Sequence, residues 1–275
     1  MKTRIIAGVS AAVVLIGIIY WMPVEVAMMA VAVCSVLSYL EYDKLFFPAS
    51  KLPRHVALSS MVLLTLMALR ISLQWAFVLF GMFYIVLAVF HVLFSSRQQS
   101  MQEVVQHFSL EMVGYVYLTG LYGFIVPVLE IPGSGKDYLL LLFAWVFVGD
   151  SAAYFVGKHW GKRPLAAQVS PKKTIEGAVA AVVASFFVAW VWLRWIYQGN
   201  ADFQFILRLF LIAPVLSVLA QLGDLFESVL KRSQGQKDSG AFLPGHGGIL
   251  DRVDGLAFSA PVFYFYVTRF LERIS

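Results

Sequence analysis

Residues 138–156 read YLLLLFAWVFVGDSAAYFV, a run of 19 residues in which Asp150 is the one charged side chain. A helix needs about 20 mainly apolar residues to cross the hydrocarbon core of a bilayer, which is about 30 Å thick. The run is therefore long enough to span a membrane as a helix. Its hydrophobicity is continuous and does not alternate, which excludes a strand of a transmembrane β-barrel.

The same pattern recurs along the chain of 275 residues, which is 60% hydrophobic and 13% charged with a mean hydropathy of +0.78. This composition excludes a water-soluble globular protein. Nine stretches approach spanning length, and they are residues 5–22, 24–40, 56–69, 71–94, 108–129, 138–156, 178–197, 205–222 and 255–271. The third is short and is expected to be tilted or partly re-entrant. The sequence predicts an all-α, polytopic membrane protein with about nine transmembrane helices.

The first stretch has the charge pattern of a signal peptide, because it follows Lys2 and Arg4. No small-residue cleavage site follows it and a second stretch begins at once, so we interpret it as a helix of the mature protein. Five spans then form an N-terminal region, residues 1–130. Four spans and two long loops form a C-terminal catalytic region, residues 131–275.

Basic residues are distributed unequally between the two faces of the membrane. If the N-terminus is cytoplasmic, fifteen of the twenty-one Lys and Arg residues lie on the cytoplasmic side. This bias predicts a multi-pass protein of the cytoplasmic (inner) membrane with its N-terminus inside. The net charge of +5 is then concentrated on one face and suits anionic headgroups or a nucleotide.

All the loops predicted to be cytoplasmic contain thirteen basic residues, and nine of these lie in two of the loops, residues 157–177 and 223–255. In the second loop, Asp224, Glu227, Ser228 and Lys231 follow the spacing i, i+3, i+4 and i+7. A helix that continues from the eighth span would place all four on one face. The alternative is a solvated helix end with a salt bridge between Glu227 and Lys231.

A glycine-rich segment, residues 244–248, follows and can bring backbone N–H groups close to an anion. Asp251 and Asp254 share a helix face, and with Asp224 they would place three carboxylates at one cytoplasmic surface. A hard divalent cation is the natural partner for such a group, and Mg²⁺ fits because it keeps positions for water and phosphate. Zinc is disfavoured because the histidines are scattered and Cys34 is the only cysteine.

Asp150 lies inside the sixth span, where a carboxylate is costly and is therefore expected to face the bundle and to have a function. The alternative is a structural ion pair with Lys or Arg. Residues 170–174, SPKKT, place two lysines and two hydroxyls before the seventh span. Such groups near a helix N-terminus favour phosphate binding, although an ordinary basic cytoplasmic loop is the alternative.

Acidic metal ligands opposite a basic phosphate site indicate metal-assisted phosphoryl or nucleotidyl transfer. A nucleotide-binding P-loop is excluded, because Gly133-Ser134-Gly135-Lys136 is followed by Asp137 and lies on the other face of the membrane.

Three segments of the second loop then form a specific pattern: Ser228-Val-Leu-Lys231-Arg232, Lys237-Asp238-Ser-Gly240, and Leu243-Pro-Gly-His246-Gly-Gly-Ile-Leu-Asp251-Arg252-Val-Asp254. This pattern resembles the signature of the CDP-diacylglycerol synthases, also called phosphatidate cytidylyltransferases. Residues 149–158 and 170–177 are also similar to that family. The resemblance covers roughly the C-terminal half, while the N-terminal half resembles the family only as a series of hydrophobic spans.

The resemblance implies the Mg²⁺-dependent reaction of CTP with phosphatidate, which gives CDP-diacylglycerol and pyrophosphate. CTP and phosphatidate in the bilayer are the expected partners. No nucleic acid is expected, and a homodimer is compatible with the sequence. The implied catalytic residues are Asp224, Asp251, Lys231 and Lys237. Asp224 and Asp251 are the implied principal metal ligands, with Asp254 in support, and a second cation nearby is compatible with the resemblance. The implied substrate-binding residues are Asp150, Ser170, Lys172, Lys173, Thr174, Glu227, Ser228, Arg232, His246, Gly247, Gly248 and Arg252.

Three other functions are weighed against this one. A CDP-alcohol phosphotransferase needs the pattern D-G-x-x-A-R, but Asp254-Gly255 continues as Leu-Ala-Phe-Ser without the arginine. A CTP-dependent polyprenol or phytol kinase shares related motifs but transfers the γ-phosphoryl group, so pyrophosphate release distinguishes it. An ion-coupled transporter would also place Asp150 and Glu111 inside the membrane, but it is typically built from repeats, and the sequence has no internal repeat.

Overall fold

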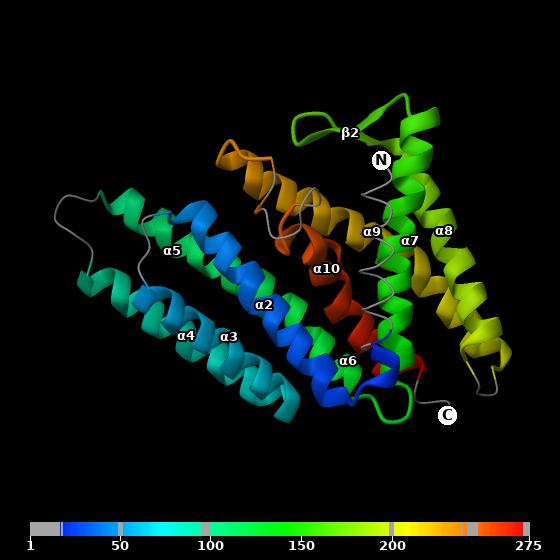
Figure 1. Cartoon of the computed structure of the whole chain (residues 1–275), viewed down its shortest axis with the longest axis horizontal. Coiled ribbons are helices and arrows are strands. Elements are labelled where there is room, and N and C mark those ends of the chain that lie inside the picture. The colour runs from blue at the N-terminus through cyan, green and yellow to red at the C-terminus, as the bar shows by residue number, and fades with distance from the viewer. Residues whose placement is uncertain are drawn as a thin grey trace.

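The computed structural model describes residues 17, 19–48, 52–94, 100–197, 201–237, 239–240 and 247–271. These residues form a helical bundle with one small β-hairpin (Figure 1). The α-helices are α2 (Val24–Phe46), α3 (Leu52–Ile71), α4 (Leu73–Phe94), α5 (Met101–Tyr115), α6 (Ile125–Leu129), α7 (Gly135–Trp160), α8 (Ile175–Trp195), α9 (Phe203–Ser233) and α10 (Leu250–Tyr266). The hairpin consists of β1 (Pro164–Ala166) and β2 (Ser170–Thr174), which pair antiparallel.

Within the described residues, six helical segments are long and apolar enough to cross a membrane, so the chain is a multi-pass membrane protein. They are Val24–Phe46, Leu73–Leu93, Met101–Leu129, Gly135–Trp160, Ile175–Trp195 and Phe203–Ser233. These six segments confirm that the chain crosses the membrane several times, but not the predicted number of about nine spans. The predicted third span is short, since only Ala57–Ile71 of α3 is apolar. The predicted ninth corresponds to the 17 residues of α10 and the π-helical segment Val267–Leu271. The predicted first span falls almost wholly outside the described residues.

Polar side chains fix the beginnings of several helices. Ser100 and Glu103 form a reciprocal capping box at α5, and the Asp202 carboxylate accepts a hydrogen bond of 2.7 Å from Phe205 N at α9. Thr174 Oγ1 accepts a hydrogen bond of 3.1 Å from Gly177 N at the start of α8. Each of these bonds satisfies a backbone N–H that the helix itself cannot pair.

Helices α2 to α5 lie on one side of the bundle, α7 and α8 lie on the other, and α10 lies between the two groups (Figure 1). Helix α9 packs against α8 and α10. Small residues permit close approach of α9 and α10: a Cβ atom added to Gly223 would lie 2.3 Å from the carbonyl oxygen of Asp254. Because membrane helices associate by such close packing, the Gly223 contact places the acidic residues of α9 beside those of α10.

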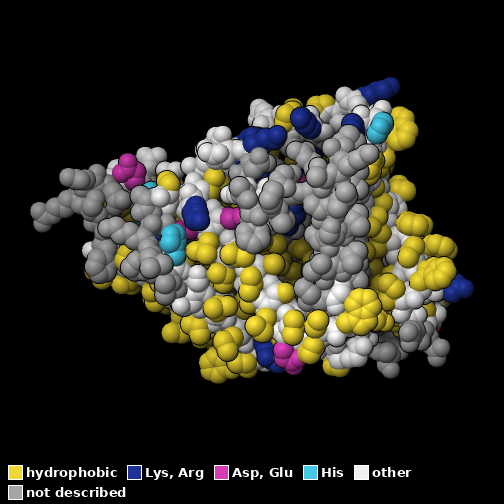
Figure 2. Space-filling view, in the orientation of Figure 1, with side chains coloured by type: hydrophobic (Ala, Val, Ile, Leu, Met, Phe, Trp, Pro, Cys, Tyr) yellow, Lys and Arg dark blue, Asp and Glu magenta, His cyan; other side chains and the backbone are white. Residues whose placement is uncertain are grey.

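Hydrophobic side chains cover a broad belt of the surface, and Lys and Arg gather at one end of it, around β2 (Figure 2). The belt includes large exposed side chains such as Trp75, Phe187 and Trp195. At the opposite end, Arg70 pairs with Glu130 at 2.9 Å. A belt between two charged ends is the surface that a membrane-spanning protein presents to lipid.

Candidate active site

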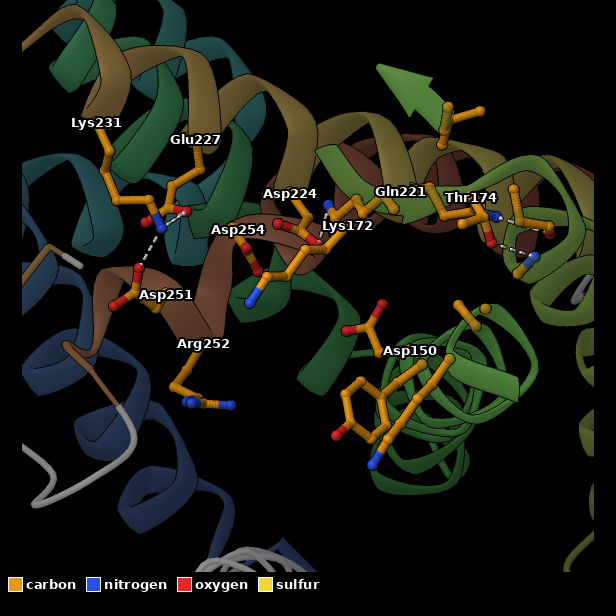
Figure 3. Close-up of a pocket in the computed structure, with 18 residues that line it drawn as sticks. Asp150, Lys172, Thr174, Gln221, Asp224, Glu227, Lys231, Asp251, Arg252 and Asp254 are labelled. Carbon is orange, nitrogen blue, oxygen red and sulfur yellow. Dashed lines mark hydrogen bonds and ion pairs between the residues drawn. The ribbon is translucent and has the colours of Figure 1, made fainter. Parts of the chain in front are cut away.

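A cavity of about 760 Å³ opens at the basic end of the bundle, between α7, the hairpin, α9 and α10. Side chains from all four elements converge on it (Figure 3). Its charged lining consists of five carboxylates and five cations: Asp150, Asp224, Glu227, Asp251 and Asp254, and Lys158, Lys172, Lys173, Lys231 and Arg252. The two loops chosen from the sequence, residues 157–177 and 223–255, therefore contribute to one site.

Three carboxylates of this lining form a compact acidic group, which we define as Asp224, Glu227 and Asp254. One oxygen atom from each lies within 4.8 Å of the other two. Asp224 and Glu227 are one turn apart on α9, and Asp254 projects from α10 beside Gly223. Glu227 is completely buried, and its charge is balanced by an ion pair.

That ion pair is made by Lys231, whose Nζ also lies 2.5 Å from Asp251 Oδ1. The predicted alternative, a salt bridge between Glu227 and Lys231, is thus present, but it is buried rather than solvated. The other oxygen of Asp251 accepts hydrogen bonds from Gly248 N at 2.8 Å and Ser239 N at 3.3 Å. Burial raises the pKa of Asp251, but the contacts with Glu227, Lys231 and Gly248 outweigh it and hold that pKa below its ordinary value.

The hairpin supplies the basic wall of the cavity. Lys173 forms an ion pair with Asp224, and Lys172 lines the cavity beside it. Glu176, at the start of α8, holds the base of the hairpin by accepting hydrogen bonds from Lys162 N at 3.1 Å and Arg163 Nε at 3.0 Å. The sequence predicted a loop over residues 157–177, without strands. The structure forms two strands instead, because backbone pairing across the short turn satisfies the polar groups of the segment.

Asp150 extends from α7 toward the cavity (Figure 3). Asp150 is an exposed residue. Among the described residues its carboxylate forms no ion pair within 4.0 Å. The structural alternative for this carboxylate, an ion pair with Lys or Arg inside the membrane, therefore receives no support from the geometry.

A model of the cytidylyltransferase family matches residues 2–270, nearly the whole chain. The chain belongs to the cytidylyltransferase family. It is 33% identical over 279 aligned positions to the phosphatidate cytidylyltransferase of Bacillus subtilis, and the match covers 98% of each chain. It is 37% identical to the enzyme of that name from Thermotoga maritima, over 59% of each chain. The phosphatidate cytidylyltransferase of Haemophilus influenzae is 38% identical over 49% of this chain and 47% of its own length.

The cavity of this cytidylyltransferase includes most, but not all, of the residues singled out from the sequence. Ten of them line it: Asp150, Lys172, Lys173, Thr174, Asp224, Glu227, Lys231, Asp251, Arg252 and Asp254. Six others lie outside the lining, namely Ser170, Ser228, Arg232, Lys237, Gly247 and Gly248. His246 falls outside the described residues. Arg232 contacts the hairpin instead. Its Nε donates a hydrogen bond to Val169 O at 3.5 Å, which links the end of α9 to the turn of the hairpin.

Sequence reasoning missed three polar residues that line the cavity: Gln221, Tyr154 and Lys158. A signal for Gln221 was available, because it lies three residues before Asp224 and therefore on the same face of α9. Lys158 lies over the ring of Tyr154, with Nζ 5.8 Å from the ring centre. Both belong to the segment 149–158 that carries part of the family resemblance.

The acidic group offers oxygen atoms only, which suits a hard divalent cation such as Mg²⁺. The burial of Glu227 fits this assignment, because Lys231 is shared between Glu227 and Asp251, so one positive charge balances two carboxylates and a further cation would compensate the other. Asp251 was predicted as a principal metal ligand. In the structure it lies beside the acidic group, and its oxygens contact Lys231, Gly248 and Ser239.

Proposed function

We infer that the protein is a phosphatidate cytidylyltransferase, which converts CTP and phosphatidate to CDP-diacylglycerol and pyrophosphate. The observation that carries this conclusion is the meeting of an acidic group and a basic wall in one cavity at the polar end of a membrane bundle. A nucleotide from water and a phosphate at the bilayer surface could both reach a cavity in that position. The near full-length similarity to an enzyme of this name supports the same activity.

The acidic group, Asp224, Glu227 and Asp254, is proposed to hold Mg²⁺. When bound, the ion supplies charge neutralisation and orientation of phosphate oxygens. The cavity lining carries equal numbers of acidic and basic side chains. A nucleoside triphosphate bound there without a metal ion would therefore leave a large excess of negative charge in the cavity. Asp251 is proposed to hold Lys231 in place, and the sequence prediction that Asp251 is itself a ligand can be tested against this assignment.

The basic wall is proposed to bind the phosphates of both substrates. An oxygen of the phosphatidate phosphate attacks the α-phosphorus of CTP, a new P–O bond forms, and the bond to the β-phosphate oxygen breaks to release pyrophosphate. Lys172 and Lys173 lie close to the acidic group on the hairpin, where they can balance charge on the departing pyrophosphate. A phosphate monoester is largely ionised near neutral pH, so the attacking oxygen needs no strong general base.

The protein is proposed to lie in the inner membrane of a bacterial cell. Its cavity would face the cytoplasm, where CTP is made. The excess of Lys and Arg at its end of the bundle supports this orientation through the positive-inside rule (Figure 2). The N-terminus would then also be cytoplasmic.

The activity can be tested with purified protein in detergent, by measuring pyrophosphate released from CTP with and without phosphatidate and Mg²⁺. We expect release only with all components present. Asp224→Asn should lower turnover about a hundredfold, because it removes charge from a group of three ligands. Glu25→Gln is the matched control, since Glu25 is an exposed carboxylate outside the cavity lining. Release of pyrophosphate without phosphatidate, or full activity in Asp224→Asn, would contradict the proposal.

A further inference from the structure

Glu41, near the end of α2, makes an unusual set of contacts with a segment about 200 residues later. Its Oε1 accepts a hydrogen bond from Ile249 N at 3.1 Å, and its Oε2 accepts one from Leu250 N at 3.0 Å. Oε2 also accepts a hydrogen bond of 3.2 Å from the hydroxyl of Ser239. One carboxylate of the N-terminal region thus receives three donors from the segment that leads into α10.

The contacts with Glu41 provide a helix cap that the sequence just before α10 does not supply. The residue that precedes α10 is Ile249, whose side chain cannot accept a hydrogen bond from the first turn. Glu41 caps that turn from another helix, and its negative charge lies at the positive end of the helix dipole. This cap is provided by a helix that is adjacent in space but distant in sequence (Figure 1).

Two glycines allow the backbone to approach this carboxylate. A Cβ atom added to Gly240 would lie 2.7 Å from Glu41 Oε1, and one added to Gly248 would lie 2.2 Å from Oε2. Any larger residue would collide with the cap. Gly248, which belongs to the segment that the sequence suggested for anion binding, therefore has a second role in this fold, since it and Gly240 make room for Glu41.

The capped turn carries the residues that order the acidic group. Asp251 and Asp254 both lie within the first five residues of α10. Asp251 contacts Lys231, and Lys231 pairs with Glu227 of the acidic group. A displacement of the turn would therefore move one ligand directly and loosen the support of another.

On the basis of the proposed function, we propose that Glu41 is a positioning residue for the cytidylyltransferase reaction, which holds the first turn of α10 so that the acidic group keeps its geometry. Glu41 lies outside the cavity lining, so it acts through α10 and not on the substrate. It also joins the N-terminal region to the catalytic region.

The test compares Glu41→Gln with wild type and with Glu25→Gln, the same substitution at an exposed position in the first turn of the same helix. Glutamine keeps the length and one acceptor but replaces the other with a donor that faces backbone N–H groups. Hydrogen exchange of metal-free protein should be about tenfold faster at residues 249–250 in Glu41→Gln, from the loss of a hydrogen bond to a charged group. Exchange in α8 should not change.

Kinetics provide the second measurement. We expect the kcat of Glu41→Gln to fall about tenfold and the apparent KM for CTP to change less than twofold, because Lys172 and Lys173 lie on the hairpin and not on α10. Glu41→Ala should be worse than Glu41→Gln, and Gly248→Ala should reproduce both effects by displacing the carboxylate. Glu25→Gln should match wild type.

Unchanged exchange at residues 249–250 in Glu41→Gln would overturn the inference, and so would faster exchange with normal kcat. If wild-type protein forms no CDP-diacylglycerol, the proposed function fails. The exchange measurement then still decides whether Glu41 holds α10, because it requires neither substrate nor metal.

Discussion

Lys231→Met should destabilise the protein strongly, because Lys231 lies between one buried and one mostly buried carboxylate. The side chain of Glu227 is 1% exposed and that of Asp251 is 13% exposed, while Lys231 is 11% exposed. Methionine keeps the length and the apolar character of the lysine stem but removes the charge. Both carboxylates then lose their basic partner at positions that are largely shielded from water.

Removing one partner of a buried ion pair typically costs about 3 to 5 kcal/mol. For a protein of this size, each kcal/mol corresponds to about 2 to 4 °C in the melting temperature. Lys231→Met is therefore expected to lower the melting temperature by about 10 °C. The double variant Glu227→Gln/Lys231→Met should recover part of this loss, because the uncompensated charge on Glu227 is removed with that of its partner.

Thermal unfolding in detergent, followed by tryptophan fluorescence at fixed pH and salt, measures the effect. Lys158→Met is the matched control, since Lys158 lines the same cavity but is exposed, and it should shift the melting temperature by no more than about 2 °C. A loss of less than 3 °C in Lys231→Met, or a double variant no more stable than the single one, would refute the reasoning.

Three further predictions concern the metal, the topology and the basic wall. Glu227→Gln should raise the Mg²⁺ concentration for half-maximal activity about tenfold or more, whereas Asp251→Asn should mainly lower kcat. The opposite pattern in a Mg²⁺ titration would show that Asp251 is a metal ligand and would contradict the assignment. A cysteine at Lys162 should react with impermeant reagents from the cytoplasmic side only and one at Gly133 from the other side only, because the 26 residues of α7 separate them by about 39 Å; labelling of both from one side would contradict the topology. Lys172→Ala should raise the apparent KM for CTP and for phosphatidate, since Lys172 lines the cavity next to Lys173, which pairs with Asp224 of the acidic group. Unchanged values for both substrates would remove Lys172 from the phosphate site.

The spans and the two active loops were predictable from the sequence because the bilayer imposes a simple rule. A segment such as residues 138–156 must satisfy its backbone groups within a helix, and its length then follows from the thickness of the hydrocarbon. The helix face that joins Asp224, Glu227 and Lys231 was also predictable, because it depends only on helical periodicity.

Contacts between distant segments were not predictable in the same way. Periodicity placed Glu227 on the face of Asp224, but which carboxylate of α10 meets them depends on the close packing at Gly223. The structure groups them with Asp254, whereas the sequence favoured Asp251. The contact between Glu41 and Leu250 spans 209 positions and carries no local signal. The hairpin was missed because its strands are short and rich in Lys and Pro, which strand propensities disfavour.

The partition of radioactive phosphate between lipid and water tests the assignment most directly. Purified protein is given phosphatidate, Mg²⁺ and CTP labelled at either the α- or the γ-phosphate, and the lipid and aqueous phases are counted separately. A phosphatidate cytidylyltransferase transfers the α-label to the lipid and leaves the γ-label in water as pyrophosphate, and Asp224→Asn should suppress both. Transfer of the γ-label to the lipid would indicate a kinase, and α-label that stays in water would contradict cytidylyl transfer altogether.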